Sequence, residues 1–158
     1  MPDSSRARRA RLPVDRTTVE YLVLADAVEA LGGKLYMMGG GWDTMHVRNI
    51  EQPVPMSIAC GILVPWAETD DDHTLTITTE DQDRNQVAPP LTVTFKTGRS
   101  ANLERGAPTH VPFAIKAEFV LPTLGTYVIR ATVDARPEGG RSTAFSVRQA
   151  TGATSVGT

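Results

Sequence analysis

The chain has 158 residues, a length near the mode for one domain, and a net charge of −2 at pH 7. Charged residues make up 22% and hydrophobic residues 41%, which excludes a collagen, a coiled coil, a membrane protein and a generally disordered chain. The 13 glycines and 11 prolines predict many turns and short elements. The small negative charge also argues against a protein that binds nucleic acid over its whole surface.

An uneven charge distribution divides the chain into three parts. Residues 1–16 carry five arginines and two aspartates, and we interpret them as a flexible basic N-terminal segment. Its arginines are Arg6, Arg8, Arg9, Arg11 and Arg16. The remaining residues hold 11 basic and 16 acidic side chains, a net charge of −5. Because 149–158 contains almost nothing to bury, we expect a disordered tail there and one domain over 17–148.

The cysteine count and the apolar stretches predict a cytoplasmic protein. A single cysteine, Cys60, excludes an intrachain disulfide and a thiolate metal cluster, and its apolar surroundings predict a buried, inert thiol. No apolar segment follows the N-terminal arginines, so no signal peptide is expected. The longest apolar stretch, 56–67, is too short to span a bilayer.

The first element of the domain is ambiguous. The segment 15–33 has a threonine cap, good helix formers and terminal glycines, which are typical of a helix. Gly32 and Gly33 between two apolar runs are instead a two-residue hairpin signal. We favour two strands joined by a turn, and the helix remains the alternative.

A glycine motif follows at Gly39, Gly40, Gly41, Trp42 and Asp43. Phosphate-binding glycine loops lead into a helix, but the next residues here are strand-like and bring no Lys-Ser or Lys-Thr pair. We therefore assign the glycines and Trp42 a structural role, at a bulge or tight corner that passes beneath the indole ring.

The strand predicted over 56–64 has no charged face. Its second face carries Ser57, Ala59, Gly61 and Leu63, whereas the other predicted strands place threonine, lysine or glutamate on theirs. Either the chain itself covers this face or another subunit does. We take these four residues as a candidate interaction surface.

Acidic residues cluster on both sides of the strand predicted near 74–78. Asp70, Asp71 and Asp72 precede it and form a candidate loop site for calcium or a small anion. Four arginines expected at the same end, at positions 99, 105, 136 and 141, favour salt bridges or an anionic ligand over a calcium cage. The three histidines lack metal-ligand spacing, so we predict no metal and no cofactor.

The rest of the domain alternates apolar and polar residues with a period of two, over 74–78, 91–95, 111–119, 126–134 and 142–148. A turn-rich loop at 135–141 joins the last two strands. Tyr127, shortly after Leu121 and Gly125, has the position of a tyrosine corner at the start of a penultimate strand. We therefore predict an all-β, immunoglobulin-like antiparallel β-sandwich of about seven to eight strands.

The segments EYLVLADA, GGKLYMMGGGWDT and GTYVIRA together resemble an uncharacterised bacterial family of small cytoplasmic β-sandwich domains. The resemblance covers about 19–148 and excludes the basic N-terminal segment. It implies a β-sandwich fold and the hairpin over 19–38, and it implies no activity.

These features predict a non-catalytic cytoplasmic protein-interaction module, since the sequence holds no nucleophile motif. The expected partner is another protein or a second copy of the chain, with no membrane. The alternatives are tethering to nucleic acid or an acidic surface through the N-terminal arginines, and a small anion or calcium site at the acidic loop.

Overall fold

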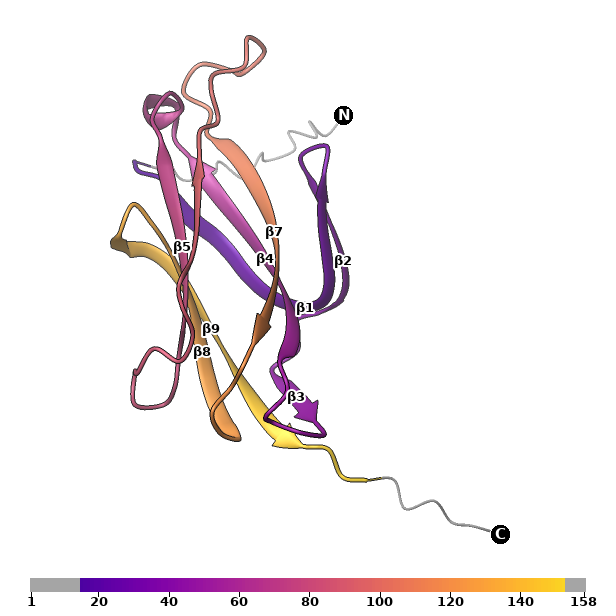
Figure 1. The fold of residues 1–158 in the computed structure, drawn as a ribbon. Helices are drawn as coiled ribbons and strands as arrows, with labels where there is room; N and C mark the ends of the chain where they lie inside the picture. Colours follow the sequence, from indigo (N-terminus) through magenta and orange to yellow (C-terminus); the bar gives the residue numbers. More distant parts are fainter. Residues whose placement is uncertain (1–14, 153–158) are drawn as a thin grey trace, which may run out of the picture.

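The computed structural model describes residues 15–152, and over this range the chain forms nine strands and one short 3-10 helix in two facing sheets (Figure 1). The strands are β1 (Thr18–Leu31), β2 (Lys34–Gly40), β3 (Thr44–Val47), β4 (Val54–Val64), β5 (His73–Glu80), β6 (Leu91–Phe95), β7 (Thr109–Phe119), β8 (Gly125–Val133) and β9 (Arg136–Gln149). The helix η1 (Trp66–Glu68) follows β4. The fold is an all-β sandwich, as the alternating pattern predicts.

The two sheets have different compositions. Four antiparallel strands in the order β2-β1-β4-β7 form the first sheet, and β3-β9-β8-β5-β6 form the second. The strand β3 pairs with β9 in parallel, whereas the other pairs between the described strands are antiparallel, as predicted. The chain crosses from the first sheet to the second between β2 and β3, and it then runs in the direction of β9.

The main core lies between the sheets and is built from the apolar face of each strand. Every residue of β4 except Pro55 is buried, and Ile58, Cys60 and Ile62 have no exposed surface. Burial raises the pKa of the Cys60 thiol to about 12, which makes it the inert thiol that the sequence predicts. None of the described helical residues forms a segment long and apolar enough to cross a membrane.

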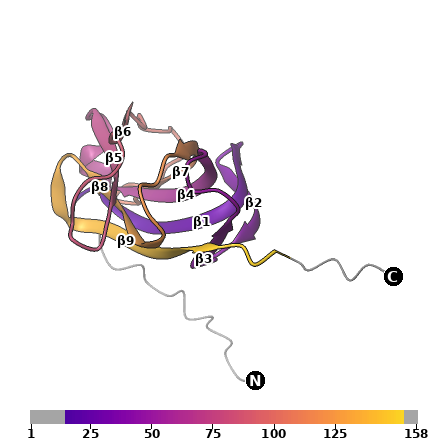
Figure 2. The same cartoon turned by 60° about the horizontal axis from the view of Figure 1, so that its bottom comes forward.

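The segment 15–33, for which the sequence allowed a helix or a strand, forms the strand β1 and the turn that follows it. Gly32 and Gly33 have φ values of +58° and +74°, the left-handed conformation that a type I′ hairpin turn needs at both positions. The first half of β1 pairs with β4 and its second half pairs with β2. Residues 26–40 therefore leave the sheet as a two-stranded ribbon, here called the hairpin arm, which curls up at one side of the molecule (Figure 2).

Two boundaries near the C-terminus differ from the expectation. The predicted loop at 135–141 is mostly strand, because Asp134 and Ala135, at φ +54° and +56°, make the turn and β9 begins at Arg136. At the other end, β9 includes Gln149 and the amide of Ala150 bonds to the Val47 carbonyl at 2.8 Å. The last strand thus ends one residue after position 148.

The predicted tyrosine corner is present at the start of β8. The Tyr127 hydroxyl donates to the Thr123 carbonyl at 2.6 Å, and it accepts from the Thr123 amide at 3.2 Å. The ring is 1% exposed and stacks on Phe145 at a centroid distance of 5.7 Å. The corner fixes the loop that leads from the first sheet into the centre of the second.

Candidate functional site

The small-residue face of β4 is covered by the chain itself. Ser57 and Leu63 are 6% and 8% exposed, and Ala59 and Gly61 are buried. The Tyr21 ring occupies the space above Gly61, and Val28 of the hairpin arm packs with Ala59. These four residues are therefore no exposed interaction surface. The absence of charge reflects a second, small apolar cluster between the sheet and the arm, and any partner must bind elsewhere.

The glycine motif forms the base of the hairpin arm. The Asp26 side chain occupies the space that a side chain at Gly39 would need, and the Met37 sulfur does the same at Gly40. The amide of Gly41 donates to the Leu24 carbonyl at 2.8 Å. Trp42 then packs edge-on against Phe145, with ring centroids 6.1 Å apart. All these contacts are within the fold, so the glycines serve close packing rather than phosphate binding.

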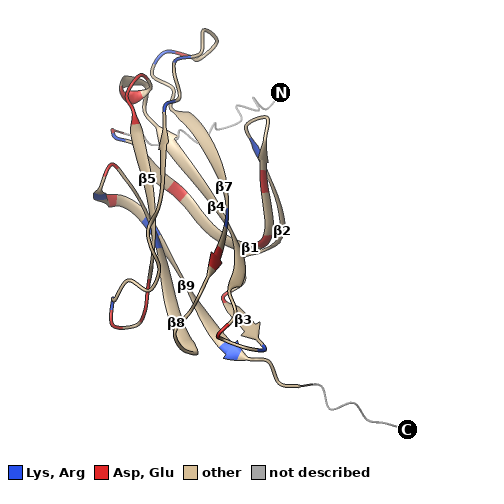
Figure 3. Ribbon diagram, viewed as in Figure 1, with Lys and Arg blue, Asp and Glu red and all other residues tan. Residues whose placement is uncertain are grey.

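The outer surface of the hairpin arm is unusually apolar. Among the described residues, six large hydrophobic side chains are exposed, and four of them lie on the arm. These four are Leu31 (64% exposed), Tyr36 (54%), Met37 (41%) and Met38 (74%). The β1–β2 register places Leu31, Tyr36 and Met38 on one face of the ribbon, opposite the face of the buried Val28. Figure 3 shows that most of the arm is uncharged.

The strand β2 also ends the first sheet. It pairs with β1 on one side, and none of the described strands pairs with its other side. An exposed edge strand with apolar side chains is a template for pairing with another extended chain. Lys34 is the one ionic residue of this strand, and the residues after it are apolar, aromatic or glycine. The sequence pattern marked this strand as an apolar run but gave no sign that it would be exposed.

Two adjoining depressions lie at the base of the arm and meet at Asp26 and Pro55. One, of about 440 Å³, is also lined by Ser57, Lys116 and Glu118. The other, of about 530 Å³, is lined by Trp42, Met45 and His46 among others. The Trp42 indole Nε1 is buried and has no hydrogen-bond partner among the described residues. These side chains mix both charges with apolar surface.

A histidine network lies on the other side of the molecule, and the sequence analysis missed it. His73 is 2% exposed, and its Nδ1 lies 2.8 Å from Asp134 Oδ2 while its Nε2 lies 2.8 Å from the Glu68 carbonyl oxygen. Since both partners are acceptors, both ring nitrogens donate only when the ring is an imidazolium. The alternation of His73 with the buried Leu75 and Ile77 was the sequence signal for this position.

The electrostatics of this network favour the charged histidine. Burial lowers the pKa of His73, but the hydrogen bonds to Asp134 and to the Glu68 carbonyl, together with both carboxylates, raise the pKa above its usual value. Burial raises the pKa of Asp134, and its bonds to His73 and the Thr74 amide lower it further than burial raises it. Glu68 accepts from the Thr17 amide at 2.8 Å, so the network also fixes the start of β1.

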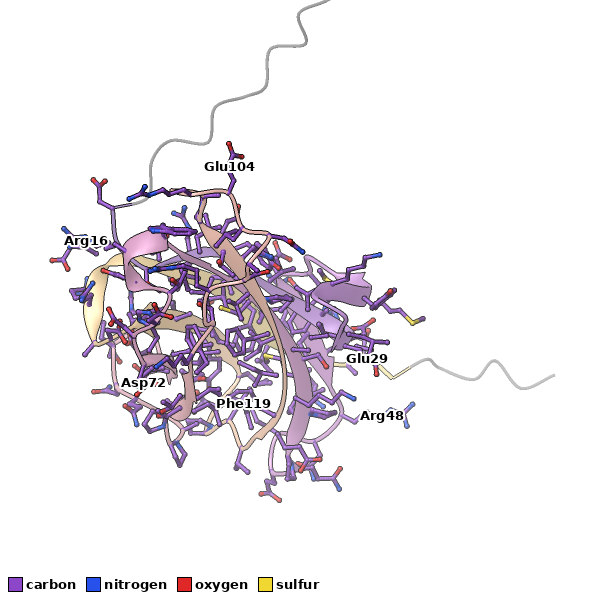
Figure 4. The ribbon with its side chains drawn as sticks, turned by 90° about the horizontal axis from the view of Figure 1, so that it is seen from above. Arg16, Glu29, Arg48, Asp72, Glu104 and Phe119 are labelled. Carbon is purple, nitrogen blue, oxygen red and sulfur yellow. The ribbon has the colours of Figure 1, made fainter. Side chains whose placement is uncertain are left out.

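The acidic loop at Asp70, Asp71 and Asp72 takes part in a salt bridge. The Arg99 guanidinium lies 3.5 Å from the Asp70 carboxylate and 4.3 Å from the Trp66 ring centroid, while Arg136 lies 3.8 Å from Glu68. Within residues 15–152, no three His, Cys, Asp or Glu side chains gather closely enough to hold an ion. Asp71 and Asp72 are exposed. Figure 4 shows Asp72 on the opposite side of the molecule from Glu29 of the hairpin arm.

The basic N-terminal segment is mostly outside the described residues. Arg6, Arg8, Arg9 and Arg11 lie there, and the structure gives no account of them. Arg16 is exposed and lies next to Thr17, which is bonded to Glu68. The segment therefore joins the domain at the end that carries the acidic loop.

Comparison with known proteins gives a family and no activity. Residues 20–147 match the model of a family described only as a family of unknown function, DUF6941. No curated protein matches the chain. The matched range contains the hairpin arm, both sheets and the histidine network.

Proposed function

Since the chain belongs to DUF6941, a family whose function is unknown, we propose from its own geometry that it is a non-catalytic protein-interaction module that binds through the hairpin arm. The observation that carries this proposal is the concentration of exposed Leu31, Tyr36 and Met38 on one face of a ribbon whose edge strand is open. Large aromatic and thioether side chains are enriched at protein interfaces, and an open edge adds backbone hydrogen bonds to their contacts.

The remaining chemistry of the domain supports a binding role over a catalytic one. Both ring nitrogens of His73 are used by contacts within the fold, and the Cys60 thiol is buried with a raised pKa. The lone cysteine is also typical of a protein that works in the reducing cytoplasm, where we propose that this module acts.

The test compares variants of the arm with variants of a distant apolar position. Tyr36→Lys and Met38→Lys place a charge on the arm, while Val120→Lys and Leu124→Lys do so at the other two exposed hydrophobic residues. We expect the tagged arm variants to capture at least tenfold less of one specific protein from cells than the wild type and both controls. That protein, purified, should bind the wild type directly in calorimetry. Equal capture by all four variants would overturn the proposal.

We also propose that the sandwich is a variant of the immunoglobulin fold. The order β1-β4-β7 in one sheet and β9-β8-β5-β6 in the other corresponds to the strands A-B-E and G-F-C-C′ of that fold. The tyrosine corner at the start of β8, the equivalent of strand F, supports the same correspondence. The hairpin arm is then an insertion within the first strand region, and an experimental structure tests this assignment.

A second candidate function rests on the charge division of the sequence. Residues 1–16 have a net charge of +3, and the rest of the chain has −5. A basic segment of this kind binds phosphate backbones in a salt-dependent manner. We keep tethering to nucleic acid through this segment as the alternative, and its test is argued in the Discussion.

A further inference from the structure

We propose that the partner of the hairpin arm is a second copy of the chain, paired antiparallel through β2 about a two-fold axis at Met37. This inference rests on the proposed function and names its partner. The two arms then form one four-stranded ribbon, β1-β2-β2′-β1′, with the open edges of both copies removed. A contact of this kind is isologous, so the same residues serve on both sides.

The sequence of β2 is complementary to itself in this orientation. Its midpoint is Met37, so an antiparallel pairing over the full strand sets Lys34 opposite the partner copy's Gly40 and Leu35 opposite its Gly39. The bulky half of each strand therefore meets the glycine half of the other, and the largest side chains are spread along the ribbon. A parallel pairing in register would instead set each bulky residue against itself.

The backbone groups of β2 have the right polarity for the same pairing. In a hairpin with a two-residue turn, the pair that flanks the turn is hydrogen-bonded, here Leu31 with Lys34. Alternate residues from Lys34 onward therefore direct their amides and carbonyls at β1, and those of Leu35 and Met37 point outward. Two copies meeting at Met37 exchange bonds through these outward groups.

The exposed side chains gain partners on the outer face. Tyr36 of each copy lies opposite Met38 of the other, which joins the four most central apolar side chains into one stripe. Thioether sulfur against an aromatic ring is a favourable contact. Leu31 lies on the outer strand of this ribbon, next to Lys34 of its own copy.

The single charged residue of β2 also favours the antiparallel orientation. Lys34 is the one ionic residue of β2 and lies at the tip, whereas the Asp26 carboxylate lies over Gly39 at the base. Antiparallel pairing brings the lysine of each copy to the base of the other opposite Gly40, on the face of the ribbon away from Asp26, and keeps the two lysines apart. A parallel pairing would set the two lysines side by side, which is unfavourable.

The first test uses disulfide formation in the full-length protein. Met37→Cys places a thiol on the two-fold axis, and Leu31→Cys is the matched control at an exposed site of the same arm. Cys60 stays in place because it is buried and its pKa is about 12. We expect Met37→Cys to form a covalent dimer at least tenfold faster than Leu31→Cys under mild oxidation. Equal rates would overturn the proposed axis.

The second test measures the oligomeric state by sedimentation. We expect a wild-type dimer, a monomer for Tyr36→Lys and for Met38→Glu, and a restored dimer for the double variant, in which the new lysine of each copy faces the new glutamate of the other. Met37→Pro, which removes an outward amide, should also be monomeric, and Met37→Leu should not. A double variant that stays monomeric while the wild type is a dimer would overturn the register.

A wild-type protein that remains monomeric at its highest soluble concentration would overturn self-pairing. That result leaves the proposed function standing, because the function fails only when the arm variants and the Val120 and Leu124 controls capture the same protein equally. The two failures are therefore distinguishable.

Discussion

The space and the charge around a position determine which residue is stable there, and His73 is the clearest case. A buried imidazolium is unfavourable unless hydrogen bonds and opposite charge offset its desolvation. Asp134 supplies a carboxylate at 2.8 Å, and the Glu68 carbonyl supplies the second acceptor at the same distance. The ring thereby links the end of η1 to the β8–β9 turn, two segments far apart in sequence.

The raised pKa of His73 predicts a stability that depends on pH. The imidazolium is favoured in the folded state, so its contribution is complete below the unfolded-state value of about 6.5 and is lost as the pH rises through the higher folded-state value. His73→Gln should therefore destabilise the protein by about 2 kcal/mol at pH 6 and by less at higher pH. Urea unfolding of both proteins across this range measures the difference, and parallel pH profiles would contradict the prediction.

The two carboxylates of the network act in the opposite direction. The pKa values of Asp134 and Glu68 are lowered, so their contributions are present above their unfolded-state values and are lost as the pH falls through the folded-state ones. The network is thus strongest between the titration of the acids and that of the histidine.

Gly61 is a second residue whose identity the surroundings determine. A Cβ at this position would collide with the Tyr21 ring, which stacks near His110 at a centroid distance of 5.7 Å. Gly61→Ala should destabilise the wild type by about 1–2 kcal/mol through displacement of that ring. In a Tyr21→Ala background the same substitution should be neutral or slightly stabilising. Denaturant unfolding of the wild type, the two single variants and the double variant gives a double-mutant cycle. Additive changes in unfolding free energy would contradict a contact between Gly61 and the Tyr21 ring.

At the scale of elements, the strands were largely predictable and their arrangement was less so. Alternation over 91–95 and 111–119 predicted β6 and β7, and Gly32 with Gly33 predicted the β1–β2 turn, because these features depend on neighbours in sequence. The curl of the hairpin arm over β4 depends on contacts such as Val28 with Ala59, which are distant in sequence. The sequence therefore indicated that something covers the small-residue face of β4, but it could not indicate that the hairpin arm does so.

The same distinction explains the other differences. The parallel pairing of β3 with β9 joins residues about a hundred positions apart. The sequence of Thr44–Val47 therefore contains no local pattern that predicts this partner. The turn at Asp134 and Ala135 places two non-glycine residues at positive φ, so the turn-rich composition of 135–141 indicated a longer loop. Exposure of Tyr36 and Met38 likewise follows from the sheet order and not from their own pattern.

The tyrosine corner gives an element-scale prediction, since it holds the connection between β7 and β8. Tyr127→Phe keeps the buried ring and removes the hydroxyl that bonds to the amide and carbonyl of Thr123. We expect a loss of about 1–2 kcal/mol in unfolding free energy, with the sandwich retained. Thermal unfolding measures it, and Tyr36→Phe, at an exposed ring, serves as the control. An equal shift for both variants would argue against the corner.

For the whole molecule, the charge is divided between an acidic domain and a basic N-terminal segment. The residues from 17 onward have a net charge of −5, so the domain itself repels phosphate. The tethering alternative therefore assigns affinity for nucleic acid to the five arginines of residues 1–16, of which Arg16 is exposed at the edge of the domain. The hairpin arm lacks the basic character for that role, with Lys34 as its single cation.

This division makes the alternative function separable from the arm. Nucleic-acid binding through three to five arginines should show log K falling with log salt at a slope of roughly −3 to −4.5 on duplex DNA. Deleting residues 1–16 should abolish this binding and leave the association through the arm unchanged, whereas Met38→Lys should do the reverse. Fluorescence anisotropy across a salt series, beside sedimentation of the same proteins, measures both. If the truncated protein binds DNA as well as the full chain does, the tethering alternative is wrong, because the arginines of residues 1–16 then contribute nothing to binding.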